Sequence, residues 1–325
     1  MNGPRPPPIV RGVVTIAAAS APFEHDVPAC LARIRALLDA AREAGAGLVV
    51  LPESAIGGYV LEGGAAPGLP PALEPDGPEI ARLIELAGDL VVCAGYTELG
   101  ERGERYAAAV CVGDGEVLGR HRKVHLPPAE RFAYTPGDAF AAFDTPAGRI
   151  GMLLCYDKLF PEAARALALD GAQVLCTLAA WPVDRVAPAE RVSEDRQTRH
   201  FDLADQMRAI ENQVFAVASN QVGSWGPVDF LGGAKVVDPD GVVLARTGAW
   251  AGLAVARVDL AQVEGTRAVI DHLADRRPAA YGTASVTART CAGSSLNTGH
   301  PIPPSSSACW SGSPTAVLTT AAPSR

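Results

Sequence analysis

The sequence predicts an α/β domain in which helices pack in layers against β-sheet. Its 325 residues are 48% hydrophobic and 20% charged, as in ordinary folded proteins. Short apolar runs typical of buried strands recur along the chain, and segments with helical periodicity lie between several of them. Turn signals also join neighbouring strand-like runs directly, which indicates hairpins beside the βαβ units. These patterns favour a mixed sheet over a pure βαβ alternation.

The N-terminal third of the chain predicts three strands separated by two helices. In the first helix, apolar residues from Cys30 to Ala41 recur every three or four positions, and Gly45 is a stop signal. Pro78 suits the first turn of the second helix, because its missing N–H is not needed there. The expected elements are strands at 10–18, 48–51 and 91–94 and helices at 26–45 and 78–87.

The rest of the domain predicts hairpins as well as helices. Gly113-Asp114-Gly115 is a turn signal between two strand-like runs, the second of which spans Val117 to His121. Asp238-Pro239-Asp240-Gly241 is a second such turn, with a short strand expected on each side. Pro161 opens a further helix. The other expected elements are strands near 140–143 and at 150–154, 174–178, 214–218 and 253–258 and a long helix near 190–212.

The composition changes abruptly after Asp275. The final 50 residues contain no Asp, Glu or Lys and are rich in Ser, Thr, Pro, Ala and Gly. Such a segment buries too little apolar surface to offset its ordering entropy. We therefore expect a flexible N-terminus at 1–8, a folded domain at 9–282 and a disordered tail at 283–325. An outline of a signal peptide precedes Ala21, but a strand followed by a helix explains the same residues better.

The charge and the cysteines exclude several classes of protein. The net charge is −8, and it is −12 without the final 50 residues, which leaves 24 basic and 36 acidic residues. A nucleic-acid partner needs a basic stripe, and the sequence has none. No apolar run approaches the roughly 20 residues that span a bilayer. The seven scattered cysteines include no Cys-x-x-Cys pair, so we expect no disulfide framework or zinc site and a cytoplasmic location.

Cys155 is the first candidate for chemistry. It follows the predicted strand at 150–154 and stands six residues before Pro161, at a sharp strand-to-helix turn. Such turns expose a side chain at the carboxyl edge of a sheet, where ligands of α/β proteins bind. A lone cysteine is nevertheless more often a buried core thiol than a nucleophile. The position alone therefore does not establish a function.

Two charged residues stand at similar places. Glu53 follows the buried strand at 48–51, and Lys123 follows the strand that ends at His121. The usual fate of both residue types is exposure to solvent. The chain, however, uses only three lysines beside 25 arginines, so each lysine is more informative than usual. Together with Cys155, these residues would supply a base, a cation and a nucleophile.

The chain resembles the nitrilase, or carbon–nitrogen hydrolase, superfamily over about residues 9 to 282. The resemblance is carried by three motifs in the family's order: Leu-Pro-Glu at 51–53, Arg-Lys-Val-His-Leu at 122–126, and Cys-Tyr-Asp at 155–157 with Phe-Pro-Glu at 160–162. It implies a four-layer αββα sandwich, a homodimer or higher oligomer that extends the sandwich, and a catalytic triad of Glu53, Lys123 and Cys155. A further family glutamate matches Glu130, which precedes Thr135-Pro136-Gly137.

These residue types suit amide hydrolysis, which needs a nucleophile, a proton carrier and positive charge near the oxyanion. Cys155 would attack, Glu53 would move protons, and Lys123 with the backbone N–H of Tyr156 would stabilise the oxyanion. Glu130 would hold Lys123 and the substrate amide in position. This chemistry requires no metal or other cofactor.

The substrate is less well defined. Tyr-Asp after the cysteine is similar to the amidase and carbamoylase branches, whereas nitrilases usually carry Trp-Glu there. Tyr59, Trp181 and Pro182 are expected to line the pocket, and Trp225 to cover it. These side chains favour a small aliphatic primary amide, hydrolysed to the acid and ammonia. The alternatives are an N-carbamoyl amine or amino acid, a nitrile, or an inactive interaction subunit on this fold. All six histidines are interpreted as structural or solvated.

Overall fold

The computed structural model describes residues 12–61 and 68–281. Contacts divide the chain into a first unit that ends at Arg276 and a second that begins at Arg277. The described part of the second unit is the short helix α6 (Pro278–Tyr281). The segments predicted to be flexible at 1–8 and disordered at 283–325 lie outside the described residues. The strands and the candidate site belong to the first unit.

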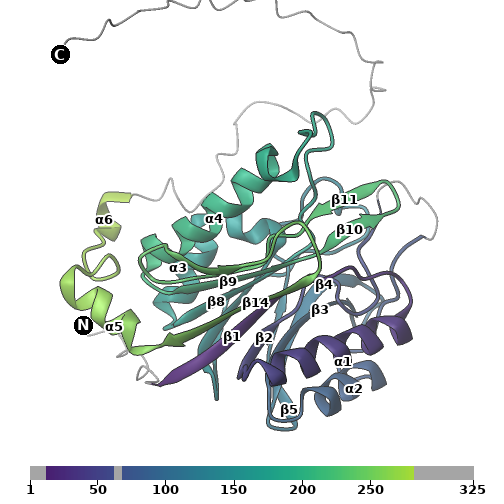
Figure 1. Ribbon diagram of the computed structural model, residues 1–325, viewed down its shortest axis with the longest axis horizontal. Coiled ribbons are helices and arrows are strands. Elements are labelled where there is room, and N and C mark those ends of the chain that lie inside the picture. The colour runs from purple at the N-terminus through teal and green to yellow at the C-terminus, as the bar shows by residue number, and fades with distance from the viewer. Residues whose placement is uncertain (1–11, 62–67, 282–325) are drawn as a thin grey trace, which may run out of the picture. The chain divides into compact units, whose positions relative to one another are not determined.

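The described residues form both strands and helices, and runs of consecutive strands lie between some of the helices (Figure 1). The strands are β1 (Val13–Ser20), β2 (Leu48–Val50), β3 (Val91–Leu99), β4 (Arg105–Gly113), β5 (Glu116–Arg122), β6 (Ala142–Thr145), β7 (Gly148–Leu154), β8 (Val174–Ala179), β9 (Phe215–Asn220), β10 (Val222–Trp225), β11 (Val228–Leu231), β12 (Lys235–Val237), β13 (Val243–Arg246) and β14 (Gly252–Asp259). The helices of the first unit are α1 (Val27–Glu43), α2 (Pro78–Ala87), α3 (Pro161–Leu169), α4 (Arg196–Asn212) and α5 (Ala261–Val269), with 3-10 turns η2 (Cys155–Leu159) and η3 (Val192–Glu194).

Twelve of the described strands form one mixed sheet with β1 at its centre, and β10 and β11 form a separate two-stranded sheet. The hydrogen-bonded order is β5-β4-β3-β2-β1-β9-β8-β7-β6, with β14 on β1 and the β12–β13 pair on β9. The β1, β2 and β3 strands run parallel, as do β7, β8 and β9. The carboxyl ends of β2 and β7 therefore lie among the ends of parallel neighbours, which is where open α/β sheets bind ligands.

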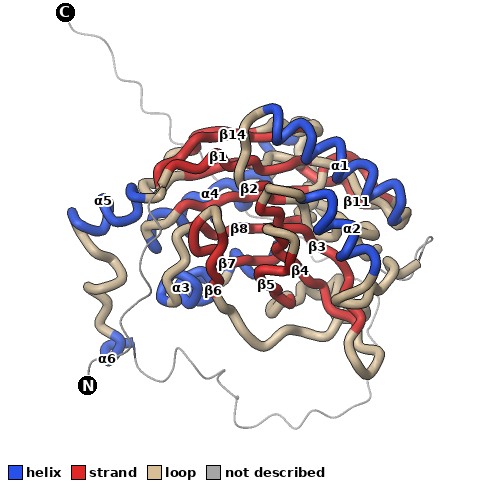
Figure 2. The backbone as a smooth tube through the Cα atoms, turned by 90° about the horizontal axis from the view of Figure 1, so that it is seen from below, coloured by secondary structure: helices blue, strands red, loops and turns tan. Residues whose placement is uncertain are grey.

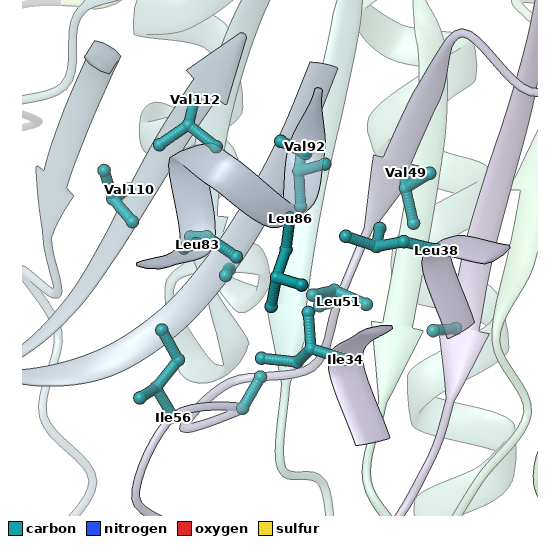
Figure 3. Packing of buried hydrophobic residues seen from close by; sticks show 14 of the residues in the cluster. Ile34, Leu38, Val49, Leu51, Ile56, Leu83, Leu86, Val92, Val110 and Val112 are labelled. Carbon is teal, nitrogen blue, oxygen red and sulfur yellow. The ribbon is translucent and has the colours of Figure 1, made fainter. Parts of the chain in front are cut away.

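Alternating side chains divide the first half of the sheet between two cores. Ala17, Val49 and Val92 pack with helices α1 and α2 (Figure 3). Ile16 and Leu48, one residue earlier on β1 and β2, instead join the core formed with β7, β8 and β9. Successive side chains of a strand point to opposite faces, so this half of the sheet has one helical cover and one sheet partner.

The second half of the sheet repeats this arrangement. Met152 and Cys176 pack against the first half, whereas Leu153 and Leu175 pack with α3. Figure 2 shows α1 and α2 on one side of the strands and α3 on the other. The four layers are therefore helix, sheet, sheet and helix. This confirms the predicted αββα sandwich.

Helix α1 shows how local sequence sets these layers. Asp26 caps it by accepting a hydrogen bond from the N–H of Ala29, and Pro28 lies in its first turn. Its buried residues Cys30, Ile34, Leu38 and Ala41 form one stripe, which packs on the sheet. The periodicity in the sequence predicted this helix, because its buried stripe keeps the 3.6-residue spacing.

Several elements differ from the sequence-based expectation. The long helix begins at Arg196 rather than near Glu190, because Asp195 caps it by accepting from the N–H of Gln197. The hairpin β10–β11 was not expected, and neither was helix α5. The strand expected near 140–143 is β6, which is displaced to Ala142–Thr145.

Two further properties concern only the described ranges. None of the helices there is long and apolar enough to cross a bilayer. The five cysteines there, Cys30, Cys93, Cys111, Cys155 and Cys176, are free and buried thiols.

Candidate active site

Three of the predicted residues lie just beyond the ends of strands. Glu53 follows β2, Lys123 follows β5, and Cys155 follows β7 at the start of the turn η2. Each side chain is at least 94% buried, and Lys123 is fully buried. Charged side chains with so little exposure are rare unless they are paired. The structure brings these three residues, 102 positions apart at the extremes, to one place.

The Lys123 ammonium is the centre of this cluster. Its Nζ donates to Glu53 Oε1 at 2.8 Å and to both carboxylate oxygens of Glu130, at 2.7 and 2.8 Å. Glu130 is itself fully buried, and its Oε1 accepts from the hydroxyl of Tyr59 at 2.7 Å. The structure thus places Glu130 on Lys123, in the position that the family resemblance implies.

Glu53 is held by backbone groups as well. Its Oε2 accepts from the N–H of Ala180 at 3.1 Å, and its backbone N–H donates to the carbonyl of Ala179 at 3.2 Å. The Cys155 thiol lies near the same carboxylate, and each of these two groups shifts the pKa of the other. Glu53 therefore lies between a cation and a thiol, which is the arrangement that a proton carrier needs.

The backbone at Cys155 is in the left-handed region, with a φ of 46°. Residues with a Cβ seldom adopt this conformation, and they retain it where the surrounding structure enforces it. Here Asp157 contributes: it is fully buried and accepts from the N–H of Leu154 at 3.2 Å and from that of His125 at 2.9 Å. The turn that carries Cys155 is thereby tied to the segment that follows Lys123.

Two histidines complete the contacts of Asp157. His121 Nε2 lies 3.1 Å and His125 Nδ1 lies 2.8 Å from its carboxylate oxygens, and the His125 ring stacks on Phe160 with centroids 3.6 Å apart. Burial alone would raise the pKa of Asp157, but the hydrogen bonds from the two histidines hold that pKa well below its usual range. Both histidines thus contact the turn that carries Cys155, and their interpretation as structural residues stays a prediction.

Close backbone approaches explain two glycines near the site. A Cβ on Gly95 would lie 2.5 Å from the backbone N of Ser54 and 2.7 Å from the Cα of Glu53. A Cβ on Gly137 would lie 2.3 Å from the carbonyl oxygen of Arg122. No side chain fits at such distances, so these glycines allow the segments bearing Glu53 and Lys123 to pack in place.

Burial and charge shift the pKa values of the cluster. Burial, opposed by Lys123, raises the pKa of Glu53 to about 7. Burial and then the Glu53 charge raise the pKa of the Cys155 thiol well above its usual value. Burial disfavours the charge on Lys123, but Glu130 and Glu53 outweigh it and hold that pKa well above normal. The cluster at neutral pH therefore has a protonated thiol, a cationic lysine and a carboxylate near its midpoint.

A cavity of about 440 Å³ lies over Cys155. The residues expected to bind substrate, Tyr59, Trp181 and Pro182, all line it, and so does Tyr156. Its other apolar walls come from side chains that the sequence analysis did not single out. These are Val60, Pro127, Leu159, Val183, Val186 and Val228.

One expectation about the cavity was wrong. Trp225 is not among its lining residues: its Nε1 donates to the carbonyl of Tyr59 at 3.2 Å, and its ring packs on His25. His200 is exposed to solvent and lines the cavity beside Arg196 and Gln197. These three residues lie on α4, and nothing in their own sequence marks them as part of a site.

A further residue supports the wall of the cavity. Asn220, at the end of β9, accepts from the N–H of Trp181 at 2.7 Å and donates to the carbonyl of Gly232 at 2.8 Å. It therefore holds the wall that Trp181 forms. Within 12–61 and 68–281, no group of three or more His, Cys, Asp or Glu side chains could hold a metal ion.

Comparisons with known proteins identify the family of this chain. The family model for carbon-nitrogen hydrolases matches residues 15–268. An (R)-stereoselective amidase of a Pseudomonas species is 36% identical over 71% of this chain and 79% of its own length. An N-carbamoylputrescine amidase of Solanum lycopersicum is 30% identical over 83% of this chain and 94% of its own.

Solved structures show the same fold. An amidase from Nesterenkonia sp. AN1, in complex with butyramide, has a TM-score of 0.68 and 26% identity to this chain. The match covers 82% of this chain and 95% of that one. The family model, the curated relatives and the fold agree over most of the described residues. The chain therefore belongs to the carbon-nitrogen hydrolase family, also called the nitrilase superfamily.

Proposed function

We propose that this protein hydrolyses an aliphatic primary amide to a carboxylic acid and ammonia through a thioester on Cys155. The observation that carries the proposal is one buried carboxylate, Glu53, that is hydrogen-bonded to the Lys123 ammonium and lies near the Cys155 thiol, which lines a mostly apolar cavity. Nucleophile, proton carrier and cation are the three groups that acyl transfer to sulfur needs.

The first half of the reaction forms the thioester. The sulfur of Cys155 attacks the amide carbon while its proton passes to Glu53, which suits a thiol that is protonated at rest. The negative charge moves to the carbonyl oxygen, where Lys123 and the backbone N–H of Tyr156 would stabilise it. The C–N bond then breaks as Glu53 returns the proton to nitrogen, and ammonia leaves.

The second half releases the acid. Glu53, again a carboxylate, takes a proton from water as that water attacks the thioester carbon. The carbon–sulfur bond breaks, the proton returns to sulfur, and the carboxylic acid leaves. Glu130 and Tyr59 would hold Lys123 and orient the amide nitrogen, since both lie on the same hydrogen-bond chain. A pKa of about 7 suits Glu53 to both roles, as base and as acid.

Several observations favour an amide over the alternatives. The cavity walls are largely apolar, which suits the alkyl chain of an aliphatic amide. A volume of about 440 Å³ leaves room for an acyl group larger than acetyl. The names of the Pseudomonas and Nesterenkonia relatives point the same way.

The experiment is a substrate screen on three purified forms. Wild type, Cys155→Ala and Glu53→Gln are incubated with primary amides, N-carbamoyl compounds and nitriles, and ammonia and carbon dioxide are measured. We expect ammonia without carbon dioxide from amides, and a loss of about 10⁶-fold in Cys155→Ala. Cys30→Ala, which removes a buried thiol from α1, is the control and should keep full activity.

The same screen decides between the candidates. Carbon dioxide together with ammonia would assign the protein to the N-carbamoyl hydrolases, and turnover of nitriles alone would assign it to the nitrilases. A wild type that releases no ammonia from any substrate would leave an interaction subunit. Mass spectrometry of Glu53→Gln with an amide should show an acyl group on Cys155, because the variant lacks the base that activates water.

Location and assembly are part of the proposal. A thiol nucleophile and five free cysteines suit a reducing compartment such as the cytoplasm. A homodimer is expected from the family resemblance, and sedimentation of the full-length protein at micromolar concentration would detect it.

A further inference from the structure

The three lysines of this chain are all fully buried, although lysine is normally exposed. Lys123 belongs to the site described above. The other two, Lys158 and Lys235, share one carboxylate: their Nζ atoms lie 2.9 and 2.8 Å from the two oxygens of the buried Asp205. Both ammonium groups also lie over the Phe201 ring, at 3.2 and 3.7 Å from its centroid.

Such a cluster is costly to bury. Two cations, Lys158 and Lys235, face the single carboxylate of Asp205. A second carboxylate, that of Asp202, lies 3.2 Å from the Nζ of Lys235 and so supports Lys235 rather than Lys158. Burial lowers the pKa of Lys158 to about 7, despite the opposing effect of Asp205. Apolar residues of similar volume often serve stability as well as a buried ion pair does. Stability alone therefore does not account for a lysine at position 158.

The location of Lys158 suggests another reason. It lies in the turn η2, three residues after Cys155. Its ammonium crosses to α4, where it donates to Asp205 and, at 3.3 Å, to the carbonyl of Phe201. This side chain therefore fastens the turn of the proposed nucleophile to helix α4.

Helix α4 also holds the wall of the cavity. Gln197 accepts from Trp181 Nε1 at 3.0 Å, and the Phe201 ring packs edge-on against the Trp181 indole, with centroids 5.7 Å apart. The Lys158 ammonium itself lies 4.9 Å from the centre of the Trp181 ring. Cys155, Trp181 and Phe201 belong to one buried cluster. The spacing between Cys155 and the Trp181 wall is thus set through α4.

We propose that Lys158 is a positioning residue that fixes the turn of Cys155 against the Trp181 wall and so favours amides whose acyl group reaches that wall. This inference rests on the proposed amidase function. A short amide such as acetamide is aligned by the polar groups around Lys123 alone. A longer acyl chain must contact the Trp181 wall and at the same time present its carbonyl carbon to the Cys155 sulfur. Its reaction therefore depends on the spacing between that wall and the sulfur.

Lys235 provides a matched control for this role. It contacts the same carboxylate and the same ring, but it lies on β12 and does not line the cavity. Lys158→Met and Lys235→Met each remove one ammonium and leave Asp205 paired with the other. Methionine has a similar length, so neither variant should open a large cavity in the core.

The first measurement is kcat and KM of both variants with hexanamide and acetamide. We expect the preference for hexanamide over acetamide to fall about tenfold in Lys158→Met, mainly through kcat, because small misalignments at a reacting atom are costly. Lys235→Met should change the preference less than twofold. A loss of folded protein lowers both activities together, so it cannot change their ratio.

Two results would overturn the inference. An equal fall in preference in both variants would assign Lys158 to the stability of the cluster, and an unchanged preference in Lys158→Met would remove its role. Thermal unfolding checks that each variant is folded. Lys158→Gln, which keeps a hydrogen-bond donor, is the second variant; failure of both Lys158 variants to fold would also leave only a structural role.

A second measurement does not require turnover. Alkylation of Cys155 by iodoacetamide and by N-hexyl iodoacetamide is followed by mass spectrometry of the peptide that contains it. We expect the ratio of the two rates to shift in Lys158→Met and not in Lys235→Met. If the wild type hydrolyses no amide, the proposed function fails, but the ratio of the two alkylation rates still tests whether Lys158 fixes the spacing between Cys155 and the Trp181 wall. An unshifted ratio in Lys158→Met would reject that role.

Discussion

Glu53 is a buried side chain, and its burial disfavours the ionised form of its carboxyl group. Its carboxylate accepts a hydrogen bond from the Lys123 ammonium, yet burial raises its pKa to about 7. A carboxylate in water would be almost fully ionised at that pH and would be a weak acid catalyst. Burying Glu53 thus costs folding free energy, and the result is a carboxyl group that is partly ionised near neutral pH.

The pH profile should report this group. Because the proposed mechanism needs an ionised Glu53 in the free enzyme to accept the thiol proton, kcat/KM should fall about tenfold for each pH unit below about 7. The measurement is kcat/KM for an amide between pH 5 and 9. An acidic limb near pH 4.5 instead would mean that burial does not shift this carboxylate.

Stability should show the opposite dependence. A carboxyl group with a raised folded-state pKa adds stability that is full below its unfolded pKa, near 4.5, and is lost as the pH rises through about 7. Glu53→Gln keeps a neutral group at all pH values. Its thermal midpoint should therefore exceed that of the wild type at pH 8 and match it at pH 5. A lower midpoint at pH 8 would show that the ionised form stabilises the fold.

At the scale of elements, the site depends on how closely segments can approach. Gly95→Ala on β3 would push a methyl group into the backbone at Glu53 and Ser54. We expect a loss of about 1–3 kcal/mol in stability, as for overpacked cores, and a clear fall in kcat. The checks are chemical denaturation and amide turnover.

Gly265 provides the comparison for that variant. It lies in α5, and a Cβ there would meet no atom within 4 Å. Alanine should stabilise that helix by up to about 1 kcal/mol and leave turnover unchanged. If Gly95→Ala behaved like Gly265→Ala, the close approach would have no bearing on the position of Glu53.

The sequence predicted elements where packing and local chemistry agree. The strand ends before Glu53 and Cys155 were predicted because the apolar runs at 48–51 and 150–154 stop there, and the strand before Lys123 was predicted from the turn signal at 113–115. The hairpin β10–β11 was missed, since its four-residue strands include exposed Gly223 and Ser224 and lack a clear alternation. The start of α4 was misplaced because its cap, Asp195, stands among several other charged residues.

The candidate site was predictable only in part. The motifs locate four residues along the chain, but the cavity walls come from segments without a motif. Leu159, Val228 and His200 reach the cavity only through the tertiary arrangement of η2, β11 and α4. No pattern in a single sequence encodes that arrangement.

At the scale of the whole molecule, the candidate site and its supports precede Arg277. Deletion of residues 284–325 should therefore leave turnover and the thermal midpoint unchanged. Deletion from residue 262 onward is the contrasting variant: it removes Val263, which is fully buried against the core between the sheets, and should lower the midpoint. A lower midpoint in the shorter deletion would show that the C-terminal segment contributes to folding.

The burial of all three lysines also determines how the protein can be handled. The ε-amines are the usual targets of succinimidyl esters, aldehyde cross-linkers and amine-coupled sensor surfaces, and here each is enclosed and fully shielded from solvent. Arginines supply the surface cations instead. Conjugation or immobilisation of the native protein through amines would have to use the α-amino group, so a probe attached this way would mark a single defined position.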